Sequence, residues 1–264
     1  MHLTMELVVI KIGGNIIDDE EKLAVFLDVF ATVGGMKILV HGGGKLATRV
    51  AEGLGIRQQM VDGRRITDQE TLNVVTMVYA GAINKNIVAG LQARGVNAIG
   101  LTGADGNAIL AHKRNHPSID FGYVGDVDSV NTALFSGLLH SGKTLVVAPI
   151  THNGKGQLLN TNADTIAQEI ARGLSGEFDT SLVYSFEKSG VLLDASDDRS
   201  VIPRIHPAYY AELKEKQAIF AGMIPKLDNA FAALGGGVCK VIIGKAEELP
   251  QLLSGLSGTT IVHE

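Results

Sequence analysis

The first 54 residues alternate twice between a strand pattern and a helix pattern, which constrains the fold more than any other feature. Residues 7–12 and 37–40 are apolar runs rich in branched side chains, as buried parallel strands are. Residues 18–30 and 46–54 carry apolar side chains at helical spacing. This order predicts βαβ units and a parallel sheet, with ligands beyond the carboxyl ends of the strands.

Glycine turns follow both strands. Gly42, Gly43 and Gly44 come after the second strand, and Gly13 and Gly14 after the first. Glycine lets a ligand approach the backbone N–H groups closely, and a helix N-terminus adds a partial positive charge. The repetition favours anion binding, for which phosphate and carboxylate are equally suitable. Tight turns without a ligand are the alternative.

Further along the chain, residues 107–127 show short alternating runs, which predict a β-hairpin. Residues 144–150 predict one strand and residues 163–174 a helix. A Gly/Ser-containing stretch at residues 173–176 is the expected boundary between two lobes, 1–175 and 176–264. A hairpin inserted near a site could act as a lid.

Composition excludes several classes of partner. The 264 residues carry a net charge of −5, which argues against nucleic acid or a membrane surface as the main partner. The single cysteine, Cys239, has apolar neighbours and is expected to be a reduced core residue. No export signal is visible, so we expect a cytoplasmic protein.

One motif is rejected. Residues 137–144 match the phosphate-binding pattern G-x-x-x-x-G-K-[ST] letter for letter. That loop requires a strand before it and a helix after it. Here a helical pattern precedes Gly142 and the strand at 144–150 follows, so we interpret the match as chance.

The search for chemistry leaves a set of anion-binding groups. No nucleophile motif is present, and His112 and His116 flank a basic hairpin segment, so surface roles are favoured over metal ligation. His41 could contact a ligand, but local pairing is more common. The remaining candidates are the glycine turns with Lys11, Arg65, Lys226, Asn160 and Asp164. Such groups can bind and stabilise a phosphoryl group without an acid or a base.

Six segments together resemble the amino-acid kinase family, in particular its acetylglutamate kinase branch. They lie in the expected order over almost the whole chain, at residues 11–14, 41–44, 63–67, 122–125, 160–164 and 222–226. The resemblance implies a three-layer αβα sandwich with a mainly parallel central sheet and an inserted β-hairpin lid. It also implies an N-acylglutamate-binding lobe at 1–175 and an ATP-binding lobe at 176–264.

The resemblance assigns roles to residues. Lys11 and Lys226 would stabilise the phosphoryl group in transit, Asp164 would hold both lysines, and Gly14 and Gly44 would donate backbone N–H groups. The amino-acid substrate would contact Gly43, Gly44, Arg65 and Asn160, with Arg65 on its α-carboxylate. The nucleotide would contact Lys11, Gly13, Gly14, Ser185, Gly190, Gly222, Met223 and Lys226. Mg²⁺ would arrive with ATP, without a metal-binding cage in the protein.

The implied reaction is the ATP-dependent phosphorylation of N-acetyl-L-glutamate to N-acetyl-L-glutamyl 5-phosphate in arginine biosynthesis. Residues 185–190 depart from the family pattern by one extra residue, which affects the expected nucleotide contacts. The early position of Lys11 favours a homodimer without arginine inhibition. Three alternatives stay open: a bulkier acyl group such as succinyl, another amino-acid kinase substrate, and a non-catalytic ligand sensor on the same fold.

Overall fold

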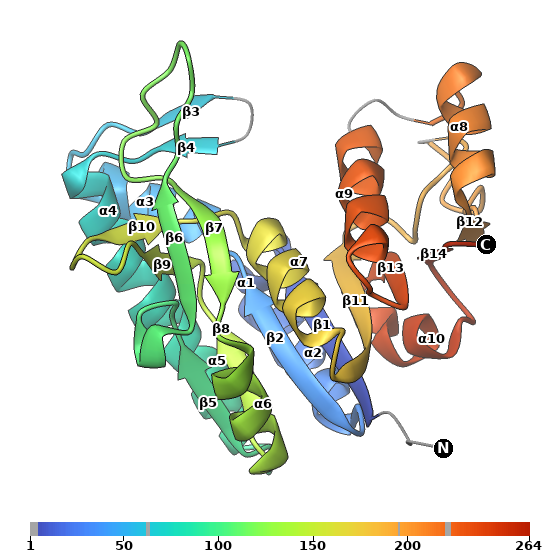
Figure 1. The fold of residues 1–264 in the computed structure, drawn as a ribbon, viewed down its shortest axis with the longest axis horizontal. Helices are drawn as coiled ribbons and strands as arrows, with labels where there is room; N and C mark the ends of the chain where they lie inside the picture. The colour runs from blue at the N-terminus through green and yellow to red at the C-terminus, as the bar shows by residue number, and fades with distance from the viewer. Residues whose placement is uncertain (1–4, 62–63, 195, 220–222) are drawn as a thin grey trace.

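A computed structural model describes residues 5–61, 64–194, 196–219 and 223–264. An eight-stranded sheet forms its centre (Figure 1). The strands pair in parallel except for one antiparallel pair, β13 with β14. In spatial order they are β12 (Arg204–Ile205), β14 (Thr259–Ile261), β13 (Lys240–Lys245), β11 (Phe178–Phe186), β1 (Met5–Ile12), β2 (Met36–His41), β8 (Thr144–Val147) and β5 (Ala98–Leu101).

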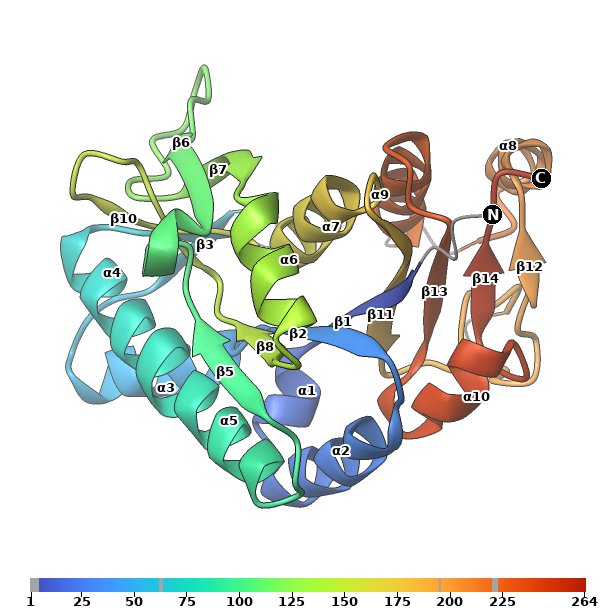
Figure 2. The ribbon, with the colours of Figure 1, turned by 60° about the horizontal axis from the view of Figure 1, so that its bottom comes forward.

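Helices cover both faces of this sheet, as Figure 2 shows. Alternate residues of β1 explain why, because Leu7 and Val9 enter one core cluster and Ile10 and Ile12 enter the other. The first cluster is covered by α6 (Thr132–His140), α7 (Ala163–Leu174), α8 (Pro207–Glu215) and α9 (Ile224–Gly235). The second is covered by α1 (Gly14–Ile17), α2 (Glu20–Thr32), α3 (Gly44–Gly53), α4 (Gln69–Thr76), α5 (Asn84–Gln92) and α10 (Leu249–Ser254). The expected three-layer sandwich is therefore confirmed.

Two smaller sheets lie at the end of the molecule where β1 and β2 finish. One holds β10 (Leu158–Asn160), β9 (Ile150–His152), β6 (Ile109–Lys113) and β7 (Gly125–Val130), and the other pairs β3 (Gln59–Val61) with β4 (Arg64–Ile66). The β6–β7 hairpin confirms the strands expected within 107–127. The segment between β6 and β7 is joined to the residue that follows β4, because Tyr123 N donates to Thr67 O at 2.6 Å.

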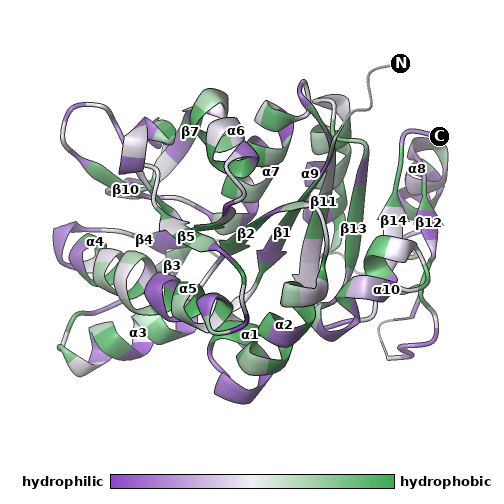
Figure 3. Cartoon of the chain, turned by 90° about the horizontal axis from the view of Figure 1, so that it is seen from below, coloured by the Kyte–Doolittle hydropathy of each residue, from purple (hydrophilic) through white to green (hydrophobic). Residues whose placement is uncertain are grey.

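One long helical segment packs under the glycine turns. It comprises α4, a π-helical stretch, η1 (Met77–Ile83), and α5, and it runs over residues 69–92. Within the described residues it is the one helix whose length and composition would suffice to cross a membrane. Leu72, Val75, Ile87 and Leu91 are buried in the second core cluster. Figure 3 shows that the central strands are mainly hydrophobic and that hydrophilic residues lie on the flanking helices.

Some expectations from the sequence were wrong. The stretch 144–150 is divided between β8 and β9, because the chain leaves the central sheet at Ala148 and Pro149. Cys239 is exposed, since it lies directly before the first residue of β13 and does not enter the core. The order expected around the rejected phosphate-loop pattern was correct, because α6 precedes this segment and β8 follows it.

Candidate active site

The triglycine turn begins α3. Gly43 is the N-cap residue at φ +144°, and α3 starts at Gly44. A Cβ on Gly43 would lie 2.2 Å from Ile83 Cδ1 and 3.3 Å from Tyr79 Cδ1, both in the π-helical stretch. Backbone conformation and packing therefore both require glycine here. The turn leaves the first N–H groups of α3 available to an anion.

The second glycine turn lies beside the first. Ile12 pairs with His41 in the register of β1 and β2, and Gly42 N donates to Ile12 O at 3.1 Å. The short helix α1 starts at Gly14, directly after Gly13. Parallel neighbouring strands thus end together and bring two glycine turns to one edge of the sheet.

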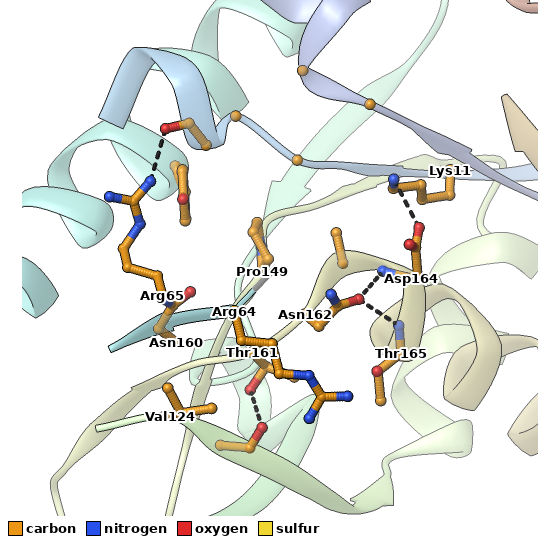
Figure 4. A pocket seen from close by; sticks show the side chains of 18 of the residues that line it. Lys11, Arg64, Arg65, Val124, Pro149, Asn160, Thr161, Asn162, Asp164 and Thr165 are labelled. Carbon is orange, nitrogen blue, oxygen red and sulfur yellow. Dashed lines mark hydrogen bonds and ion pairs between the residues drawn. The ribbon is translucent and has the colours of Figure 1, made fainter. Parts of the chain in front are cut away.

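The N-terminus of α7 faces the end of β1. The Asn162 side chain caps α7 by accepting hydrogen bonds from Asp164 N (2.8 Å) and Thr165 N (3.2 Å). In the first turn, the Asp164 carboxylate forms an ion pair with Lys11 Nζ at 2.7 Å (Figure 4). The side chains of Lys11 and Asp164 are 17% and 34% exposed, so the pair is accessible to a ligand.

A cavity of about 240 Å³ lies between these elements. It is lined by the glycine turns, the Lys11–Asp164 pair and polar residues of the smaller sheets. Gly14, Gly43, Gly44, Arg65 and Asn160, all expected in the site, are among its lining residues. The structure therefore brings together the residues expected to hold the amino-acid substrate.

Hydrogen bonds fix Arg65 in the wall of this first cavity. Arg65 is 8% exposed, and its Nη2 donates to Gly44 O (2.9 Å) and Thr48 Oγ1 (2.8 Å), while Nη1 donates to the Gln58 side chain. The phenol of Tyr79 also interacts with the guanidinium; burial raises the Tyr79 pKa and Arg65 opposes that shift. A cation held in this way is oriented for a carboxylate before the ligand binds.

Asn160 is held differently. It is the last residue of β10, and its Nδ2 donates to Thr67 Oγ1 at 3.1 Å. Its backbone N donates to Tyr123 O at 2.8 Å, so the residue after β4, the segment between β6 and β7, and β10 meet at Asn160.

A second cavity of about 270 Å³ adjoins the first and shares Lys11, Gly13 and Asp164 with it. Its other lining residues are Asn15, Tyr184, Ser185, Glu187, Lys226, Asn229 and Ile243. The Lys11–Asp164 pair is therefore the common wall of the two cavities.

Lys226 enters the second cavity from the first turn of α9. Burial lowers the pKa of Lys226, and the charge of Asp164 works against this shift. The hydroxyl of Ser185, which is 7% exposed, has no hydrogen-bond partner within the described part of the chain. A buried unsatisfied hydroxyl in a cavity wall is suited to bind a polar ligand.

Of the expected nucleotide contacts that the structure describes, Gly190 and Met223 do not line either cavity. Gly190 packs against Thr259 and Val201, where a Cβ would come within 2.8 Å of both side chains. Met223 is buried in the first core cluster. Gly222, and Gly63 of the 63–67 segment, lie outside the described residues.

His41 is a core residue and does not line either cavity. Its Nδ1 bonds to Gly42 O at 2.8 Å, and Nε2 lies 3.2 Å from Asn84 Nδ2. Burial lowers the pKa of His41 to about 4, so the ring is neutral at pH 7. Since the neutral ring donates from Nδ1 to the Gly42 carbonyl, Nε2 accepts from Asn84.

Sequence reasoning missed several lining residues. Tyr184 precedes Ser185 on β11, and Glu187 follows that strand. Tyr79 lies in an apolar helical segment whose pattern predicts a helix and no ligand contact. The position of Tyr184 and Glu187 at the carboxyl end of a strand next to β1 is the one signal that could have indicated them.

Comparison with known proteins adds independent findings. The sequence model of the amino acid kinase family matches residues 6–245. An acetylglutamate kinase of Bacteroides fragilis is 56% identical over 92% of this chain and 94% of its own length. One of Cytophaga hutchinsonii is 57% identical over 94% of this chain and 95% of its own.

A solved structure shares the fold. The N-acetylglutamate synthase of Neisseria gonorrhoeae, complexed with coenzyme A and N-acetyl-glutamate, superposes with a TM-score of 0.81. The match covers 98% of this chain and 60% of the synthase at 23% identity. This likeness concerns the fold alone.

Proposed function

The chain belongs to the amino acid kinase family, and from this premise we propose that it is an acetylglutamate kinase. It transfers the γ-phosphoryl group of ATP to the side-chain carboxylate of N-acetyl-L-glutamate. One carboxylate oxygen bonds to the γ-phosphorus while the bond from that phosphorus to the β,γ-bridging oxygen breaks. The products are N-acetyl-L-glutamyl 5-phosphate, an intermediate of arginine biosynthesis, and ADP.

The shared wall of the two cavities is the observation that carries this proposal. Phosphoryl transfer requires two substrates that meet end to end, with cations at their junction. Lys11 and Asp164 line both cavities, Lys226 enters from one side, and the glycine turns lie on the other. We infer that the acylglutamate occupies the first cavity and ATP the second.

Charge stabilisation is the main catalytic task. In our proposal Lys11 and Lys226 neutralise the negative charge that develops on the phosphoryl oxygens, and Asp164 positions both ammonium groups. Gly14 and Gly44 donate backbone N–H groups to the same oxygens. A glutamate side chain with a reference pKa of about 4.3 is already ionised at pH 7, so the nucleophile needs no general base.

Recognition of the amino acid falls to Gly43, Gly44, Arg65 and Asn160. Arg65, fixed by three hydrogen bonds, would bind the α-carboxylate. This role is supported by its place in the first cavity, beside the glycine turn.

The nucleotide contacts comprise Lys11, Gly13, Gly14, Ser185 and Lys226, together with Gly190, Gly222 and Met223 as expected from the resemblance. The described residues contain no group of three or more His, Cys, Asp or Glu side chains that could hold a metal ion. As the resemblance implies, Mg²⁺ would be bound through the phosphates of ATP. Bound there, Mg²⁺ would neutralise part of the phosphate charge.

A second candidate substrate is another N-acylglutamate, such as N-succinyl-L-glutamate. Two further arginines, Arg64 and Arg114, line the first cavity. Arg114 is paired with Asp126 through Nε at 3.1 Å, and Arg64 is exposed at the rim. A second carboxylate on the acyl chain would be attracted to this side of the cavity.

Each lobe of the molecule would bind one of the two substrates. The lobe 1–175 would bind the acylglutamate and the lobe 176–264 the nucleotide. We expect a cytoplasmic homodimer whose partners are small molecules. A ligand sensor without catalysis would not need Lys11 and Lys226, and both lysines line the second cavity.

The experiment measures ADP release from ATP and Mg²⁺ with N-acetyl-L-glutamate and, side by side, N-succinyl-L-glutamate. Hydroxylamine traps the acyl phosphate as a hydroxamate, which identifies the carboxylate as the acceptor. Carbamate, L-aspartate and free L-glutamate are the controls. Absence of ADP and hydroxamate with both acylglutamates would refute the kinase assignment, and the ratio of the two kcat/KM values identifies the acyl group.

A further inference from the structure

The first turn of α9 has an unusual support. Its N-cap residue, Met223, makes no side-chain capping bond. Instead Tyr210 of α8, 7% exposed, reaches this turn from the neighbouring helix, and its hydroxyl lies 3.1 Å from Ile224 O and 2.8 Å from Asp228 Oδ1. The hydroxyl carries one proton, so it is shared between a carbonyl and a carboxylate.

These two acceptors bracket Lys226. Ile224 lies two residues before Lys226 and Asp228 two residues after it, so one hydroxyl spans the helical turn that carries the lysine. The Tyr210 ring stacks on Phe231 of α9, with a centroid distance of 5.1 Å and an interplanar angle of 22°. The ring and the hydroxyl together restrict both translation and rotation of this turn.

A second side chain of α8, Lys214, also contacts Asp228. Lys214 Nζ lies 3.4 Å from Asp228 Oδ1 and 5.0 Å from the centre of the Tyr210 ring. Hydrogen bonds to charged groups are stronger than neutral ones, so the Tyr210 hydroxyl bonds more strongly to Asp228 than to the Ile224 carbonyl. The contact between α8 and α9 is therefore polar at the turn that bears Lys226 and aromatic one turn further on.

We propose that Tyr210 is a positioning residue for Lys226. It anchors the first turn of α9 to α8 and thereby keeps the ammonium group of Lys226 beside the phosphoryl group that is transferred. This inference rests on the proposed function, since it gives a catalytic purpose to the anchored lysine. Tyr210 lines neither cavity. It acts through Lys226, whose ammonium group must lie within about 3 Å of the oxygens that it neutralises.

The test compares Tyr210→Phe with Tyr209→Phe. The first substitution removes only the hydroxyl and keeps the ring on Phe231. We expect kcat to fall about tenfold, with KM for the acylglutamate unchanged, because the correctly placed charge of Lys226 is needed mainly in the transition state. Tyr209, half-buried with its ring 6.1 Å from that of His206, is the matched control, and its variant should keep the wild-type kcat.

A double-mutant cycle separates positioning from general weakening. In a Lys226→Ala background, Tyr210→Phe should lower kcat no further, because the residue on which it acts is absent. Asp228→Asn provides a second variant of the same link and should lower kcat less than Tyr210→Phe. Unchanged kcat in Tyr210→Phe, or an equal fall with and without Lys226, would overturn the proposal.

A measurement that does not depend on turnover completes the test. Mass spectrometry gives the rate at which an amine-reactive reagent labels Lys226, with Lys155 in an exposed loop as the internal reference. Tyr210→Phe should raise the Lys226 rate at least twofold, and an unchanged rate counts against the anchor. If the wild-type protein forms no ADP, the proposed function fails, and the labelling rate alone decides whether Tyr210 holds Lys226.

Discussion

Lys11 and Lys226 reach the boundary between the two cavities from different elements, β1 and α9. Lys11→Ala and Lys226→Ala should each lower kcat by about 100- to 1,000-fold and change KM by less than about fivefold, because the charge is needed mainly in the transition state. Steady-state kinetics with both substrates measures the two constants. Lys155→Ala, in an exposed loop, is the control. An effect confined to KM would contradict the assignment.

Arg65 should behave in the opposite way. Arg65→Ala removes the cation assigned to the α-carboxylate and should raise KM for the acylglutamate by about 10- to 100-fold, with a smaller effect on kcat. Arg65→Lys keeps the charge but loses the planar fork, so it should recover only part of the affinity. Isothermal titration of the acylglutamate checks both variants. Arg57→Ala, exposed nearby in the sequence, should bind as the wild type does, and an unchanged KM in Arg65→Ala would remove this residue from the clamp.

At the scale of elements, α3 depends on the residue before it. Gly43→Ala would place a methyl group 2.2 Å from Ile83 Cδ1 at φ +144°. Backbone strain and overpacking together should lower the free energy of unfolding by about 2–4 kcal/mol. Urea denaturation measures this loss.

The last residue of the same helix provides the contrast to Gly43. A methyl group on Gly53 would point into open space, and the backbone there is helical, so Gly53→Ala should be neutral or stabilising by up to about 1 kcal/mol. If Gly43→Ala were as stable as Gly53→Ala, the close contact with the π-helical stretch would be disproved.

Elements with strong periodicity were predictable from the sequence. The expected helix at 163–174 is α7, because its apolar residues keep a helical period over all 12 residues. The run at 7–12 lies within β1, because its branched apolar residues favour a buried strand. The hairpin of β3 and β4 was missed, since each strand has three residues and mixed polarity. Short strands are formed by tertiary contacts, which local patterns do not record.

Some residues of the site were also predictable from the sequence and others were not. Lys11, Asp164 and the glycines follow from motifs at strand ends and helix starts, where the chemistry is local in sequence. Asn229 and Tyr210 have no such signal, because their neighbours come from other helices and strands. The anchor on α9 can be found only when α8 is placed beside it.

At the scale of the whole molecule, the buried ring of His41 makes stability depend on pH. Its pKa is about 4 in the folded protein and 6.5 in the unfolded chain, so between these values only the unfolded chain binds the proton. The free energy of unfolding should therefore fall as the pH is lowered from 6.5 to 4, by roughly 3 kcal/mol in total from this group. Above pH 6.5 the contribution is complete.

Urea titrations at a series of pH values measure that slope. His41→Asn cannot titrate, so the variant should be less stable at pH 7 and should show a flatter slope between pH 6.5 and 4. His116, which is exposed between β6 and β7, provides the matched control, and His116→Gln should keep the wild-type slope. A slope that persists in full without His41 would assign the effect to other groups.

The ion pair between Lys11 and Asp164 belongs to both cavities, and this has a consequence for how the ligands influence each other. If one ligand changes the orientation or the charge of that ion pair, the same change alters the site of the other ligand. If ATP and the acylglutamate occupy these cavities as we propose, their dissociation constants depend on each other. By thermodynamic linkage, the factor by which the first ligand changes the affinity for the second must equal the factor in the reverse direction. A single pair of side chains would thus couple the two sites, so that binding of each substrate changes the affinity for the other.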